Sequence, residues 1–83
     1  MWTVIKLSNS ALGECYVEAT EGDPHDAFRN AANGGVEAID YWDAEDHKIT
    51  MQILQTFPDG AAAAEFARRA AAEGGCVLGA QEP

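Results

Sequence analysis

The chain has 83 residues, and 14 acidic residues against five lysines and arginines give it a formal net charge of −9. With 47% hydrophobic and 23% charged residues, its composition is typical of one folded domain and excludes a disordered tail. So negative a chain is not expected to contact the phosphates of nucleic acid or of a membrane surface directly.

The first two predicted elements form a β-hairpin. Residues 2–7 (WTVIKL) are rich in apolar and β-branched side chains, and the segment SNSALG that follows is rich in turn formers. In residues 14–20 (ECYVEAT) small or apolar side chains alternate with polar or aromatic ones, as in a strand with one buried face. We expect its second face, which carries Glu14, Tyr16 and Glu18, to be open to water or to a partner.

A short helix is predicted within residues 21–35 (EGDPHDAFRNAANGG). Asp23 is a suitable N-cap, Pro24 suits the first helical position, and Asp26 in the first turn complements the helix dipole. Gly34 fits a left-handed cap at the C-terminal end.

Two further strands are predicted in residues 36–42 (VEAIDYW) and 47–57 (HKITMQILQTF), joined as a hairpin through DAED. The alternation of the later strand breaks at Leu54, which indicates a β-bulge or burial on both sides. Of the neighbouring aromatic residues Tyr41 and Trp42, we expect one in the core and the other at the surface.

A second helix is predicted in residues 58–75 (PDGAAAAEFARRAAAEGG), with Asp59 as its cap and a Gly-Gly pair at its end. Its many alanines have the highest helix propensity and the smallest side chains, so this helix can lie very close to a sheet, with Phe66 as its main anchor. The segment CVLGA, residues 76–80, can add a fifth short strand.

The predicted order is therefore ββαββα, with an optional final β-strand. This order indicates an α+β domain over residues 1–80, with two helices packed on one face of an antiparallel sheet, and a frayed tail at residues 81–83. No apolar run approaches the roughly 20 residues needed to cross a bilayer, and no secretory signal opens the chain, which predicts a cytoplasmic protein. Cys15 and Cys76 have neither CxxC nor metal-finger spacing, which favours buried reduced thiols over a disulfide between them.

The segment IDYWDAEDH, residues 39–47, raises the question of a metal or catalytic site. Its acids do not match the ligand positions of an EF-hand loop, and the only two histidines, His25 and His47, provide no zinc pair. The chain also has no nucleophile elbow, no P-loop and no dinucleotide-binding glycine motif. The sequence therefore predicts no enzymatic activity, no metal and no cofactor.

The negative charge is concentrated in one block. Residues 14–46 contain ten acidic residues and a single base, Arg29, and so account for the whole net charge. Carboxylates two residues apart on a strand stand about 6.6–6.8 Å apart on one side. This distance is of the order of the phosphate spacing along a nucleic-acid strand, so an acidic strip can occupy a basic groove that binds nucleic acid. The candidate partner-binding residues are Glu14, Tyr16, Glu18, Glu21, Asp23, Asp26, Asp40, Asp43, Glu45 and Asp46.

In its length, its acidic block and its compact helix PDGAAAAEFARRAAAEGG followed by CVLG, the chain resembles the small, acidic, single-domain anti-CRISPR proteins encoded by phages and mobile elements. Several of these are compact α+β folds, and some are DNA mimics that occupy the DNA-binding path of an effector complex. The resemblance implies an inhibitor in the cytoplasm of the host cell, whose partner is a nucleic-acid-binding protein or complex such as a CRISPR effector. The alternative is a small homodimeric structural or regulatory domain that buries an apolar sheet face through Trp2, Tyr16, Tyr41 or Trp42.

Overall fold

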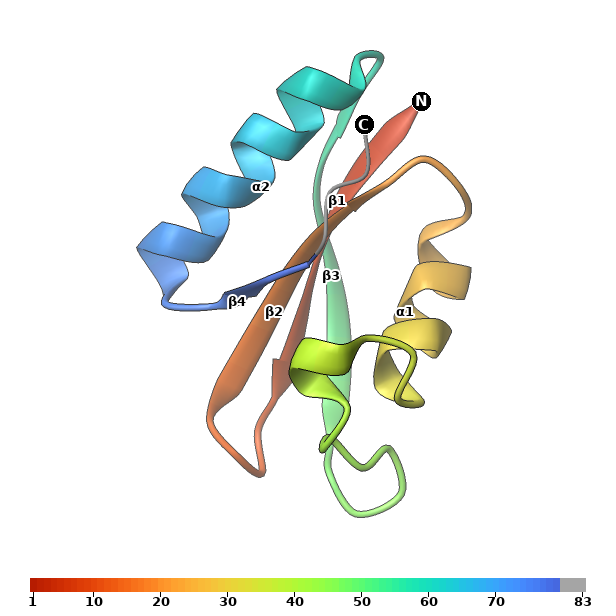
Figure 1. Ribbon diagram of the computed structural model, residues 1–83, viewed down its shortest axis with the longest axis vertical. Helices are drawn as coiled ribbons and strands as arrows, with labels where there is room; N and C mark the ends of the chain where they lie inside the picture. Colours follow the sequence, from red (N-terminus) through yellow and green to blue (C-terminus); the bar gives the residue numbers. More distant parts are fainter. Residues whose placement is uncertain (80–83) are drawn as a thin grey trace.

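A computed structural model of the protein describes residues 1–79, so that the frayed tail expected at residues 81–83 lies outside the described residues. The protein is an α+β domain, as predicted (Figure 1). Its elements are β1 (Trp2–Asn9), β2 (Glu14–Thr20), α1 (Pro24–Ala32), the 3₁₀ helix η1 (Glu37–Ile39), β3 (Ile49–Phe57), α2 (Gly60–Gly74) and β4 (Val77–Leu78).

The sheet has four strands in the order β3-β1-β2-β4. β1 is antiparallel to β2, which confirms the predicted hairpin, and antiparallel to β3, whereas β4 runs parallel to β2. The sheet is therefore mixed and not purely antiparallel, because α2 carries the chain back so that β4 enters in the direction of β2. Val4 pairs with Gln55 and Ile5 with Ile53, which leaves Leu54 as an extra residue, so that of the two alternatives predicted at Leu54 the bulge is present.

The strand predicted at residues 36–42 is wrong: this segment contains η1 and turns. Val36, Ile39 and Trp42 follow one another at intervals of three residues, which is the repeat of a 3₁₀ helix. All three pack into the core on one side, where Ile39 is 0% and Trp42 is 4% exposed. Tyr41 is 53% exposed, so one aromatic residue is buried and the other is at the surface, as expected.

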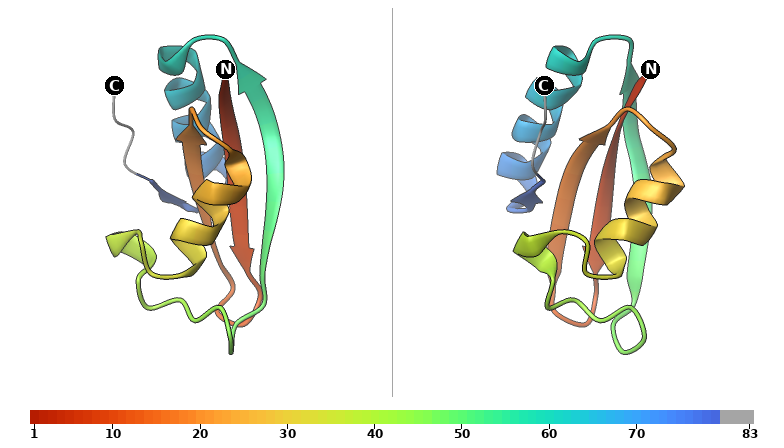
Figure 2. Two further views of the ribbon diagram at one scale, coloured as in Figure 1. Left: turned by 90° about the vertical axis from the view of Figure 1, so that its right-hand side faces the viewer. Right: turned by 45° about the vertical axis from the view of Figure 1, so that its right-hand side comes forward.

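The two helices lie on opposite faces of the sheet (Figure 2). α2 packs on a face that includes Val4 and Val17, whereas α1 and η1 cover the face that includes Ile5 and Tyr16. Neighbouring residues of a strand point to opposite faces, so adjacent buried residues such as Val4 and Ile5 require a cover on both sides. The predicted placement of both helices on one face is wrong, and the open apolar face that the homodimer hypothesis required is covered.

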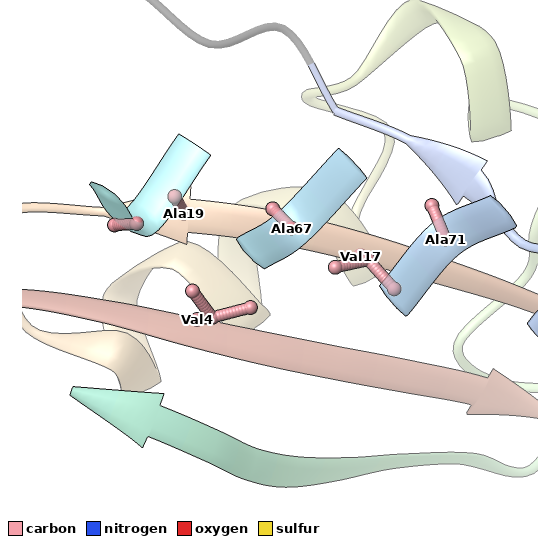
Figure 3. Packing of buried hydrophobic residues seen from close by; sticks show 6 residues of the cluster. Val4, Val17, Ala19, Ala67 and Ala71 are labelled. Atoms are coloured by element: carbon pink, nitrogen blue, oxygen red, sulfur yellow. The ribbon is translucent and has the colours of Figure 1, made fainter. Parts of the chain in front are cut away.

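Alanines bring α2 close to the sheet. Ala63, Ala67 and Ala71, four residues apart, are buried in the cluster that includes Val4 and Val17. Figure 3 shows Ala67 and Ala71 against the strands. Phe66 packs beside Phe57 with ring centroids 5.4 Å apart, as expected of an anchor. The predicted caps are also present: Asp23 and Asp59 accept hydrogen bonds from the first turns of their helices, and Gly34 and Gly75 adopt positive φ after the helix ends.

Cys15 and Cys76 form a disulfide with their Cα atoms 4.7 Å apart. The prediction of two reduced thiols is therefore wrong. The two residues are 61 positions apart in the sequence, and they meet because α2 ends beside the start of β2. Within residues 1–79, no helix is long and apolar enough to cross a membrane.

Candidate functional site

The ten predicted partner-binding residues do not form one continuous strip. Glu14 begins β2 and Glu21 follows its end, so about 20 Å of strand separates the two residues. Glu14 lies beside the loop that holds Asp40–Asp46. Glu21 lies with Asp23 and Asp26 around the start of α1, which follows the other end of β2 (Figure 1).

The middle of the expected strip is buried. Tyr16 is 1% exposed, and its hydroxyl donates a 2.6 Å hydrogen bond to Oε1 of half-buried Glu18. Burial raises the pKa of both residues, although the hydrogen bond from Tyr16 partly offsets this for Glu18. Gly79 packs directly against the Tyr16 hydroxyl, where a Cβ atom would collide with it. Tyr16 is thus a core residue, and the expectation that it faces a partner is wrong.

The carboxylates at the start of α1 take part in contacts within the helix. The Asp23 carboxylate accepts a 2.9 Å hydrogen bond from the backbone N–H of His25, and this bond lowers the pKa of Asp23. Asp26 forms an ion pair with Arg29 one turn later. Part of the negative charge at this end is therefore compensated or committed to capping.

Two aromatic donors join Glu14 to the distant acidic loop. Its Oε1 accepts hydrogen bonds from the hydroxyl of Tyr41 and, at 3.0 Å, from Nε1 of Trp42. The bond from Tyr41 and then the bond from Trp42 lower the pKa of Glu14, so this carboxylate is held in its charged form. We call the five carboxylates gathered here the acidic end; they belong to Glu14, Asp40, Asp43, Glu45 and Asp46.

The loop that carries the acidic end is itself ordered by hydrogen bonds. The Asp43 carboxylate accepts from the backbone N–H groups of Glu45 at 2.9 Å and Asp46 at 3.4 Å, which lowers the pKa of Asp43. The N–H of Asp43 donates to Nδ1 of His47 at 3.0 Å, and the buried Asn9 side chain lies 3.1 Å from the same nitrogen. Because a backbone N–H only donates, Nδ1 of His47 must be the acceptor. Asp43 is therefore a structural residue of the loop.

A shallow surface groove of about 440 Å³ opens between the end of α1 and this loop. Its lining consists of residues Ala32, Asn33, Gly34, Asp40, Tyr41, Trp42, Asp43, Ala44 and Glu45. Within residues 1–79, none of the salt bridges includes a carboxylate of the acidic end. The uncompensated charges therefore make this groove attractive to cationic groups.

The acidic end suits electrostatic contact with a basic surface. Within the described part of the chain, no group of three or more His, Cys, Asp or Glu residues is placed to hold a metal ion. The roles of Tyr41 and Trp42 as donors to Glu14, and of Asn9 and His47 as supports of the loop, were not predicted from the sequence. The aromatic pair within an acidic segment was the available signal, but the identity of its acceptor depends on a contact across 28 residues.

A scan against protein-family models found no matching family, and searches of curated proteins and of solved structures found no match to this chain.

Proposed function

We propose that this protein is a non-enzymatic binding protein whose acidic end occupies a basic, nucleic-acid-binding surface of a partner protein, as anti-CRISPR DNA mimics do. The partner class is a nucleic-acid-binding protein or complex, with a CRISPR effector as the specific candidate. The proposal rests on charge that is both concentrated and held in place.

The hydrogen bonds from Tyr41 and Trp42 to Glu14 carry the proposal. They join carboxylates from two distant segments into one surface before any partner arrives. Binding through a preformed surface loses less conformational entropy than binding through mobile loops. Carboxylates that served only to keep the protein soluble would need no fixed arrangement.

The proposal places the protein in the cytoplasm of the cell that contains its target. Disulfides are rare in that compartment. Tyr41 and Trp42 donate the hydrogen bonds that hold Glu14, and the Asp43 carboxylate accepts those that order the loop. None of these bonds involves the side chain of Cys15 or Cys76. We therefore expect the acidic end to bind its target in both the disulfide and the dithiol form.

A paired charge reversal tests the proposal. The variant Glu45→Lys/Asp46→Lys changes two exposed carboxylates of the acidic end and keeps Asp43, which orders the loop. The control Glu21→Lys/Glu73→Lys makes the same change in net charge at two exposed positions outside the acidic end. Immobilised wild-type protein is first used to capture and identify a nucleic-acid-binding partner from a nuclease-treated host lysate.

Competition with duplex DNA for the captured partner is then measured. We expect the wild-type protein to displace DNA, with an affinity that falls as salt rises. The paired reversal at Glu45 and Asp46 should weaken displacement at least about tenfold, equivalent to about 1.4 kcal/mol, whereas the control should change it much less. A partner that binds DNA equally well with and without the protein would show that the DNA-mimic proposal is wrong.

A further inference from the structure

β3 forms one edge of the sheet and is nine residues long. β4, at the other edge, has only two residues. In Figure 2 no other described segment runs along the outer side of β3. An edge strand of this length presents a row of backbone N–H and C=O groups that a further strand can pair with.

The sequence of β3 gives this edge little protection. Folded proteins usually block edge strands with charged residues, prolines or bulges. From Ile49 to Phe57 there is no charged residue and no proline, and only the bulge at Leu54 interrupts the strand. Ile53, in the middle of β3, is 49% exposed. Charged residues occur just outside the strand, at Lys48 and Asp59.

We propose that β3 pairs with β3 of a second copy of this chain, antiparallel and about a two-fold axis. The bulge restricts the register to those that oppose residues before it with residues after it. Thr50 and Gln52 pair with Ser8 and Lys6 of β1, and beyond the bulge Gln55 pairs with Val4. These even-numbered residues of β1 all lie on the α2 face, so Thr50, Gln52 and Gln55 share that face.

Opposed residues of an antiparallel pair must lie on the same face. A register that places Gln52 opposite Gln55 of the second copy satisfies this condition on both sides of the bulge. Continued past the ends of β3, the same register brings Lys48 of each copy near Asp59 of the other, whose carboxylate also caps α2. One register thus matches the faces of the opposed residues and also brings opposite charges together. In a two-fold dimer the Lys48–Asp59 contact occurs at both ends of the paired strands, which favours a second copy over an unrelated strand.

The strong negative charge of each chain does not prevent this pairing. The acidic loop directly precedes β3, so antiparallel pairing places the two acidic ends at opposite ends of the shared strands. Nine strand residues span about 30 Å. That distance exceeds the Debye length of about 8 Å at physiological ionic strength, so repulsion between the acidic ends is screened. The inference does not depend on the proposed function, and the dimer leaves both acidic ends free.

Three double variants test the pairing by sedimentation equilibrium over a range of protein concentrations. Gln52→Glu/Gln55→Glu and Gln52→Lys/Gln55→Lys each place like charges opposite one another in the dimer, whereas Gln52→Lys/Gln55→Glu places opposite charges there. Gln52 and Gln55 are exposed, so circular dichroism should show all three folded. The Lys/Lys variant separates cross-strand repulsion from overall charge, because it makes the chain less negative.

We expect the wild-type protein to dimerise, and both like-charge variants to raise the dissociation constant at least about tenfold relative to the Lys/Glu variant. Backbone amides on the outer side of β3 should exchange more slowly with solvent at concentrations that form the dimer. Dimerisation should not weaken between low and physiological salt, in contrast to binding through the acidic end. A wild-type protein that stays monomeric up to millimolar concentration, or like-charge variants that dimerise as well as the Lys/Glu variant, would overturn the inference.

Discussion

The hydroxyl of Tyr16 donates a 2.6 Å hydrogen bond to Oε1 of Glu18, two residues further along the same face of β2. Glu18 is half-buried there, and loss of contact with water raises its pKa more than the hydrogen bond from Tyr16 lowers it. A carboxylate in this position opposes folding when it is charged. Glu18 is therefore poorly suited to contact a partner, although it shares a face of β2 with Glu14 and was predicted to bind one.

We predict that Glu18→Gln raises the melting temperature at pH 7. The pKa of Glu18 is higher in the folded than in the unfolded state, so its contribution to stability is full below the unfolded pKa and is lost as pH rises through the folded pKa. An amide oxygen can still accept the hydrogen bond from Tyr16. Thermal unfolding followed by circular dichroism should give a gain at pH 7 that disappears near pH 4. The exposed change Glu21→Gln is the control for loss of one charge, and an unchanged or lower melting temperature of Glu18→Gln at pH 7 contradicts the prediction.

Tyr41→Phe should raise the pKa of Glu14. The hydrogen bond from Tyr41 is the main cause of the lowered pKa of Glu14, and the exposed Tyr41 ring can lose its hydroxyl without leaving a cavity. Because the lowered pKa belongs to the folded state, the stability from this bond is present above the unfolded pKa and is lost as pH falls through the folded one. NMR titration of the Glu14 side chain measures the shift directly. Tyr41→Phe should change the melting temperature much less in a Glu14→Gln variant than in the wild-type protein. If it changes the melting temperature equally in both, Tyr41 acts through a contact other than Glu14.

Cys15→Ser/Cys76→Ser should lower the free energy of unfolding by about 2–4 kcal/mol. The disulfide closes a long loop, because its cysteines are 61 positions apart in the sequence, and so restricts the unfolded chain. Urea unfolding measures the loss. Hydrogen exchange should show the largest local loss of protection at β4, because only two of its residues pair with β2. The reduced wild-type protein is the matched comparison. If it unfolds at the same urea concentration as the oxidised wild-type protein, the prediction is wrong.

Ala67→Leu should destabilise the protein by about 1–3 kcal/mol, the usual range for overpacking a filled core. Ala67 is 0% exposed and lies in the same cluster as Val4 and Val17 (Figure 3). Ala72→Leu, at an exposed position of the same helix, is the control and should stay within about 0.5 kcal/mol of the wild type. Chemical denaturation of both variants compares them. An Ala67→Leu variant as stable as Ala72→Leu would contradict close packing of α2 against the sheet at Ala67.

Features that depend on a few neighbouring residues were predicted well. Asp23 and Asp59 begin helices and the break at Leu54 marks a bulge, because capping and alternation are local effects. The segment around Ile39 was misassigned to a strand because its apolar residues recur at three-residue intervals, which form a short 3₁₀ turn, and not at the two-residue intervals of a strand.

Contacts between distant segments were harder to predict. The pairing of Cys15 with Cys76 and the bonds from Tyr41 and Trp42 to Glu14 exist only after the helices have taken their places on the two faces of the sheet. Consequently, the sequence predicted that an acidic surface exists but not that it is divided between two ends. The adjacent apolar residues Val4 and Ile5 of β1 were the available sign of a sheet covered on both faces.

The disulfide also divides the molecule into two topological parts. Residues 15–76 form a covalent ring that includes nearly all of β2, both helices and β3, whereas β1 lies outside it. Yet β1 occupies the interior of the sheet, between β2 and β3. Cleaving the turn between Asn9 and Glu14 would turn the fold into a complex of a circular fragment with a separate strand. The affinity between those two fragments would then report the contribution of β1 to the whole domain.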